Sequence, residues 1–201
     1  MFNDKYGLTQ AVLDGRKTMT RRIVSEKLLD RWTDYDYFCN NVSVENSPTE
    51  RQYYDKKDFF LNNAPYKLGE VVAIAQSYES VYHECGLETM DILVSSLKYN
   101  AGWTNKMFVK ADLMPRHIEF TDRKVERLQD ISDEDCLKEG IYEDSGDDEF
   151  PPSIFYEFEG NKDNGFDTPR EAFAALIDKV SGKGTWESNP YVWAYEFELM
   201  K

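Results

Sequence analysis

The alternation of apolar and polar residues along the chain predicts helices and strands in mixed order. Ser132 and Thr168 are favoured helix N-caps, and apolar residues recur at helical spacing behind Thr168. Near the end of the sequence, apolar and polar residues alternate with period two, as in a half-buried strand. The predicted helices lie near 8–14, after 25, at 87–98, after 132 and after 168, and the predicted strands at 71–75, 117–121, 123–128 and 191–199.

Local signals at the ends of these segments sharpen the prediction. Thr9 is read as the N-cap of the first helix and Gly15 as its end, which leaves Arg16 to Arg22 as a basic loop. Residues 47–50 form a capping box, Ser-Pro-Thr-Glu, with proline at the first helical position. Residues 142–167 are acidic and rich in glycine, proline and aromatic residues, which predicts a long surface loop.

The order of these elements indicates the fold class. Helices and strands interleave without the regular spacing of βαβ units and without repeats, so we expect an α+β protein with a small mixed sheet or barrel and peripheral helices. A chain of 201 residues suits one domain. Two stretches fit the pattern poorly and are interpreted as insertions in that domain, at about 33–66 and 142–167.

Composition limits the function classes. The chain has 24 basic and 38 acidic residues, a net charge of −14, and residues 130–171 hold 15 of the acids against 3 bases. Residues 16–22 are instead positively charged, with four bases and no acid. The charge therefore excludes broad coating of nucleic acid, but it permits a small ligand at one basic cleft. The acidic stretch 143–149 is either a solvated loop or a segment that screens that cleft against polyanions.

Several classes of protein are not expected. No apolar run approaches the roughly 20 residues that span a bilayer, and the first residues lack a secretory pattern, so we expect a cytoplasmic protein without a membrane partner. Three widely spaced cysteines and two scattered histidines form no metal-ligand pattern. We therefore expect reduced, mostly buried thiols, no metal and no cofactor.

The segment Gly15-Arg16-Lys17-Thr18-Met19-Thr20-Arg21-Arg22 carries the most chemistry. One interpretation is a basic loop that complements the C-terminus of the preceding helix. The other is a binding or catalytic loop, because arginine forks bind phosphate or carbonyl groups and a desolvated lysine beside a threonine can activate a hydroxyl or a water. A carboxylate partner for that lysine is expected, and spacing alone does not choose it.

This segment resembles the G-x-K-T-x-T-x-R signature of ASCH domains. Further pieces are similar, in the same order, to the longer version of the domain that is common in phage and prophage genes. Where longer relatives often carry Arg-Glu-Thr-Trp, however, this chain has Ala75-Gln76-Ser77-Tyr78. The similar pieces are Lys67–Val71, Met114–Arg116, Val125–Asp135, Glu139–Ile141 and Trp186–Trp193.

The resemblance implies a β-barrel related to the PUA fold and a link to RNA or modified nucleosides. One branch of the family hydrolyses N4-acetylcytidine with a lysine, a threonine and a glutamate, which fall by motif on Lys17, Thr20 and Glu139. By this analogy Thr20, or a water that it positions, attacks the amide carbonyl, and Lys17 accepts the proton. Glu139 orients Lys17 or protonates the leaving amine. Arg22 or Arg21 stabilises the oxyanion.

Two other functions stay open at this point. In the first, the same loop grips a phosphate or a flipped base of RNA without catalysis; in the second, the protein acts as an interaction protein through its acidic face. Trp186 is the candidate for base stacking, whereas Trp193 is expected in the core. The candidate ligand-binding residues are Arg16, Arg21, Arg22, Arg116 and Trp186.

Overall fold

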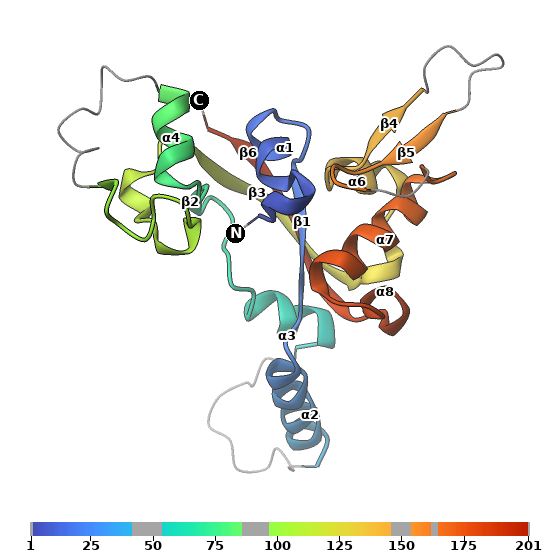
Figure 1. Cartoon of the computed structure of the whole chain (residues 1–201). Coiled ribbons are helices and arrows are strands. Elements are labelled where there is room, and N and C mark those ends of the chain that lie inside the picture. Colours follow the sequence, from blue (N-terminus) through green and yellow to red (C-terminus); the bar gives the residue numbers. More distant parts are fainter. Residues whose placement is uncertain (1, 42–53, 86–96, 146–153, 162–164, 201) are drawn as a thin grey trace.

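A computed structural model describes residues 2–41, 54–85, 97–145, 154–161 and 165–200 (Figure 1). In these segments the chain forms seven α-helices and two antiparallel sheets. Short 3₁₀ helices cover Asp4–Tyr6, Lys106–Phe108, Ala111–Leu113 and Leu128–Asp130. The α-helices are α1 (Leu8–Leu13), α2 (Glu26–Asn41), α3 (Lys56–Asn62), α4 (Tyr78–Cys85), α6 (Asp133–Lys138), α7 (Pro169–Ser181) and α8 (Thr185–Ser188).

The main sheet has four antiparallel strands in the order β1-β6-β3-β2 and curls into a half barrel (Figure 1). β3 and β6 are the long central strands, and a bulge between Phe120 and Asp122 shifts their register. β1 lies at one edge of the sheet, next to β6. The strands are β1 (Met19–Ile23), β2 (Val71–Ala73), β3 (His117–Arg127) and β6 (Tyr191–Leu199), and β4 (Tyr142–Asp144) pairs with β5 (Phe155–Glu157) in a separate ribbon.

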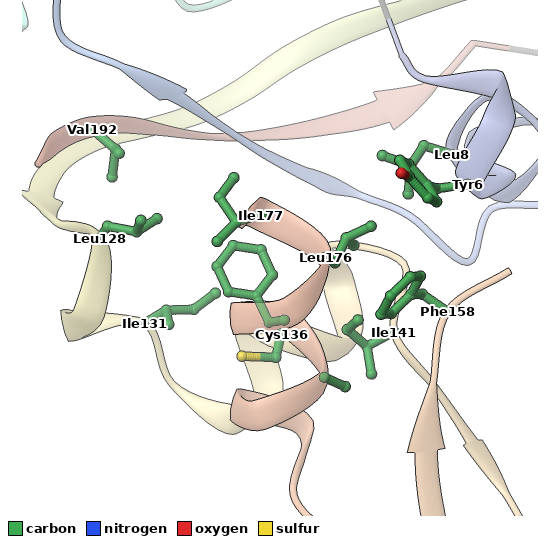
Figure 2. Close-up of a cluster of buried hydrophobic side chains, with 12 residues drawn as sticks. Tyr6, Leu8, Leu128, Ile131, Cys136, Ile141, Phe158, Leu176, Ile177 and Val192 are labelled. Carbon is green, nitrogen blue, oxygen red and sulfur yellow. The ribbon is translucent and has the colours of Figure 1, made fainter. Parts of the chain in front are cut away.

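Each face of the main sheet has its own hydrophobic core. On one face, Phe120, Trp193 and Tyr195 pack with Phe60 of α3 and Val12 of α1. On the other face α7 packs over α6 and the end of β3. Figure 2 shows this second cluster, which contains Tyr6, Leu8, Leu128, Ile131, Cys136, Ile141, Phe158, Ala172, Phe173, Leu176, Ile177 and Val192. Aromatic and aliphatic burial on both faces holds the strands that carry the basic segment.

The structure confirms much of the predicted framework. The α+β class with a barrel-like sheet is correct, with a half barrel in place of a closed one in the described part of the chain. Ser132 and Thr168 are the predicted N-caps, since their hydroxyls accept from the backbone N–H groups of Asp135 and Glu171. Trp193 lies in the core as expected. The predicted strands 117–121 and 123–128 form one continuous strand, β3.

Other local predictions are wrong. Thr9 lies inside α1 and the N-cap is Gly7, while the predicted loop at 16–22 becomes strand β1 from Met19 onward. The predicted loop at 142–167 contains the β4–β5 ribbon. Trp186, the candidate for base stacking, lies on α8. The insertion at 33–66 stays a prediction; the described part of this stretch holds the end of α2, which runs to Asn41, and α3. The capping box at 47–50 and most of the predicted helix at 87–98 lie outside the described residues.

Among the described residues, no helix is long and apolar enough to cross a membrane, and no cluster of three or more histidine, cysteine or acidic residues is suited to a metal ion. Cys136 and Cys39 are free thiols. Burial raises the pKa of the Cys136 thiol to about 12, so it is held in its unreactive neutral form, as expected for a structural cysteine.

Candidate functional site

A pocket of about 540 Å³ lies along the free edge of β1, between that strand, α7 and the segment before α1. Its polar side is built by the basic segment and Glu139. Its apolar side is built by one face of α7, which contributes Phe173, Leu176 and Ile177. Five of the eight candidate residues therefore line a single pocket, namely Lys17, Thr20, Arg21, Arg22 and Glu139.

Backbone hydrogen bonds place Lys17 at the mouth of the half barrel. α1 ends at Leu13, and Gly15, with φ +75°, turns the chain back in a conformation that disfavours other residues. The N–H of Lys17 then donates to the carbonyl of Ala11 at 2.8 Å, and the N–H of Thr18 donates to the carbonyl of Lys138 at 2.9 Å. The segment is thus tied to α1 and to the end of α6 before it enters β1.

Lys17 and Glu139 form a buried ion pair. The Lys17 Nζ lies 2.6 Å from the Glu139 Oε2 and also donates to the Glu139 carbonyl at 2.8 Å. Lys17 is only 2% exposed and Glu139 only 5%. Gly140 follows the carboxylate with φ +102°, a conformation that favours glycine, and an added β-carbon would crowd Leu8 at 3.3 Å. Residue 140 is therefore suited to glycine at the turn that directly follows Glu139.

Arg21 holds the other oxygen of Glu139 and two further carboxylates. Its Nη1 donates to the Glu139 Oε1 at 3.1 Å, and its Nη2 donates to Glu126 at 2.7 Å and to Asp135 at 2.8 Å. The half-exposed Lys124 closes the network, with 3.1 Å to Glu126 and 3.0 Å to Asp135. The acidic first turn of α6 and the end of β3 thus converge on one guanidinium.

The charges in this network set the pKa values of its members. Burial lowers the pKa of Lys17 from its ordinary 10.5, and the attraction of Glu139 only partly opposes it. Burial acts to raise the pKa of Glu139, but Lys17 and Arg21 outweigh it and the value is lowered. Two cations attract the Glu139 carboxylate, and together they outweigh the effect of burial on its pKa. Lys17 is attracted by Glu139 alone, so burial dominates its pKa. Glu139 therefore stays ionised, whereas Lys17 loses its proton more easily than a solvent-exposed lysine.

Thr20 and Arg22 alternate with Arg21 along β1 and so lie on the opposite face of the strand. Both line the Lys17 pocket and also a smaller cavity of about 130 Å³ between β1, β2 and β3. Phe2 lines both cavities, and its ring lies 6.0 Å from the Lys17 Nζ. Thr20 is only 6% exposed, so the residue is shielded from bulk solvent.

Three of the predicted ligand-binding residues lie elsewhere. Arg16 is exposed and pairs with Asp14 at 3.2 Å. Arg116 is exposed just before β3 and does not line the pocket. Trp186 packs edge-on against Phe173 but does not itself line the pocket. The structure therefore brings these three to no common site with Lys17.

Sequence reasoning missed several residues of the site. Asp135 and Glu126 were not among the candidate residues, yet both accept hydrogen bonds from Arg21. Asp4 and Lys106 form an ion pair on the pocket wall, 102 residues apart in sequence. A weak signal existed for Glu126 and Asp135, because both lie within the run 125–135 that resembles the family.

Comparison with known proteins adds no assignment: no family model, no curated protein and no solved structure matches the chain. What the site can do is therefore argued from its own geometry.

Proposed function

We propose that this protein is an ASCH-type, PUA-like domain that hydrolyses the amide bond of an N-acylated cytosine in a nucleoside or in RNA. The observation that carries the proposal is the buried pair of Lys17 and Glu139, 2.6 Å apart, on a pocket that Thr20 also lines. A lysine with a lowered pKa, a hydroxyl and a carboxylate in one cleft suit base-assisted attack on a carbonyl.

In the proposed reaction the acyl carbonyl carbon lies near Thr20 and Lys17. Lys17 in its neutral form takes the proton of the attacking water or of the Thr20 hydroxyl as the new C–O bond forms. The C–N bond then breaks, and the Lys17 ammonium returns the proton to the departing amine of cytosine. When Thr20 itself attacks, a water releases the acyl group from it in a second step.

The contacts favour distinct roles for the remaining charged residues. Both oxygens of Glu139 accept hydrogen bonds, from Lys17 and Arg21, and its pKa is lowered, so it orients Lys17 rather than acting as an acid. Arg21 is engaged by three carboxylates and serves as a positioning residue. Arg22, which lines both cavities, is the better placed guanidinium for the oxyanion.

The proposal is tested by incubating the purified protein with N4-acetylcytidine and following the ultraviolet absorbance as cytidine forms. Catalytic turnover is the expected result. No turnover, combined with saturable RNA binding that Arg22→Ala weakens and added salt abolishes, would favour the non-catalytic binding module instead.

Substitutions of Thr20 test its hydroxyl directly. Thr20→Val keeps the shape of the side chain and removes the oxygen, so we expect the hydrolysis rate to fall by about 10²-fold or more. Thr20→Ser keeps the hydroxyl and is the matched control, for which most of the activity is expected to remain. Equal rates for the valine and serine variants, each measured with the assay above, would remove Thr20 from the mechanism.

A further inference from the structure

A small cavity adjoins the Lys17 pocket between β1, β2 and β3. It measures about 130 Å³, and residues of both edge strands of the main sheet, β1 and β2, line it. Phe2, Thr20 and Arg22 line this cavity and the Lys17 pocket alike, so the two spaces meet at these three residues. A ligand beside Thr20 therefore has the larger pocket on one side and the small cavity on the other.

Apart from Thr20 and Arg22, the residues around the small cavity are apolar or aromatic. Ile74 and Ile118 belong to the hydrophobic core, and the half-buried Val72 packs against it. Empty space among such side chains forfeits van der Waals contacts, which an apolar ligand group restores. An apolar cavity of about 150 Å³ holds a benzene ring. The cavity therefore favours a compact apolar group of about that size.

The two spaces match the two halves of an acylated cytosine. In the proposed reaction the acyl carbonyl carbon lies near Thr20, at the junction of the two spaces. The nucleoside carries many hydrogen-bonding groups and suits the larger pocket, where Asn3, Asp4 and Ser181 supply polar groups. An aliphatic acyl group has no polar atom beyond its carbonyl, so it is the half that loses nothing on entering an apolar cavity.

We propose that the small cavity is an acyl subsite, which selects a branched aliphatic acyl group bulkier than acetyl, such as isobutanoyl. The inference rests on the proposed hydrolysis of an N-acylated cytosine. An acetyl group extends only one methyl beyond the carbonyl and leaves much of the cavity unfilled. The isobutanoyl group adds two carbons there, and each added buried carbon strengthens binding about fourfold.

The competing place for the acyl group is the apolar face of α7. Leu176, Ile177 and Val180 line the Lys17 pocket from this helix, and Val180 is 39% exposed, so the face is open toward solvent. An open face favours a long chain, because each added methylene gains contact along it. A small cavity bounded by Ile74 and Ile118 instead limits the length of the chain. The two arrangements therefore differ in whether a branched or a linear acyl isomer binds more tightly.

The first test is calorimetric titration of the full chain carrying Lys17→Met with N4-acetylcytidine and N4-isobutanoylcytidine. Affinity is then read separately from hydrolysis, because the proposed base is absent. The isobutanoyl compound is expected to bind about tenfold more tightly. Val72→Phe in the same background is expected to fill the cavity and remove this advantage. Val71→Phe is the matched control that keeps it, because Val71 lies on the same strand but is 47% exposed and outside the cavity.

A second substitution keeps the inference testable if Val72→Phe does not fold. Val72→Ala removes two methyl groups from the cavity wall, and N4-(2-ethylbutanoyl)cytidine carries two carbons more than the isobutanoyl compound. We expect Val72→Ala to strengthen binding of the larger compound relative to the smaller one, and Val71→Ala to leave their ratio unchanged. N4-hexanoylcytidine, the linear isomer of the larger compound, is expected to bind to Val72→Ala more weakly than the branched isomer.

The outcomes separate this inference from the proposed function. Three results would each overturn the acyl subsite, whether or not the wild type hydrolyses N4-acetylcytidine: equal affinity for the acetyl and isobutanoyl compounds, equal effects of the substitutions at Val71 and Val72, or tighter binding of the linear isomer. A size preference that depends on Val72, without turnover of any of these cytidines by the wild type, would overturn the proposed hydrolysis and keep the subsite. Absence of binding for every compound would overturn both.

Discussion

Replacing Arg21 with methionine is expected to lower the free energy of unfolding by about 3–5 kcal/mol, the cost of leaving buried charges without their partner. Arg21 is 6% exposed and donates to Glu126, Asp135 and Glu139. Methionine fills a similar volume but offers no donor, so three carboxylates lose a charge-assisted hydrogen bond in a region of low solvent access. Urea denaturation followed by tryptophan fluorescence measures this loss.

The same experiment has a predicted pH dependence. The pKa values of Asp135 and Glu139 are lowered in the folded protein, so their stabilisation is present above the unfolded values of about 4 and is lost as pH falls through the lowered folded values. Without Arg21 those folded pKa values rise. The difference in the free energy of unfolding between wild type and Arg21→Met therefore becomes smaller as the pH falls.

Arg16→Met is the matched control for the arginine substitution. Arg16 forms an exposed pair with Asp14 at 3.2 Å, and a change of less than about 1 kcal/mol is expected there. Two results would show that the ion-pair network of Arg21 does not stabilise the fold. One is a similarly small change in the free energy of unfolding for Arg21→Met. The other is a difference from wild type that does not vary with pH.

The second large effect concerns the rate of N4-acetylcytidine hydrolysis, which we expect Lys17→Met to reduce by about 10²–10⁴-fold, the usual contribution of a general base. Methionine keeps the length of the side chain without a proton acceptor. Glu139 retains Arg21 as its partner, so the variant is expected to fold. Initial rates by absorbance and a circular dichroism spectrum separate loss of chemistry from loss of structure.

Lys138→Met is the matched control for Lys17→Met. Lys138 also lies 2.6 Å from a carboxylate, that of Glu196, but it is 44% exposed. Its loss is expected to leave the rate unchanged. A Lys17→Met enzyme with wild-type activity, or an equal loss in Lys138→Met, would contradict the role given to Lys17.

Many of the helices and strands could be predicted from the sequence, because short local patterns determine where they form. N-caps at Ser132 and Thr168 and the period-two pattern before Leu199 each depend on residues within a few positions. The prediction of a loop at 16–22 was wrong because a run of basic residues was taken to be solvent-exposed. The carboxylates that pair with Arg21 lie far away in the sequence. β1 carries Arg21 into the interior only because carboxylates more than 100 residues away meet it there.

The candidate site was predictable in part. The family resemblance placed Lys17, Thr20 and Glu139 together, and the structure brings all three to one pocket. Arg116 and Trp186, chosen from their neighbours in sequence, do not join them. The Asp4–Lys106 wall had no signal in the sequence, because it depends on the packing of distant segments.

The pH–rate profile of Glu139→Gln tests most directly the claim that Lys17 is the base and Glu139 holds it. Glu139 raises the pKa of Lys17, so its neutralisation should move the rising limb of the profile for N4-acetylcytidine hydrolysis to lower pH. Glu126→Gln, which perturbs Arg21 without touching Lys17, should leave the limb in place. The account predicts a shift to lower pH in Glu139→Gln alone. An unshifted limb in Glu139→Gln, or the same shift in both variants, would contradict it.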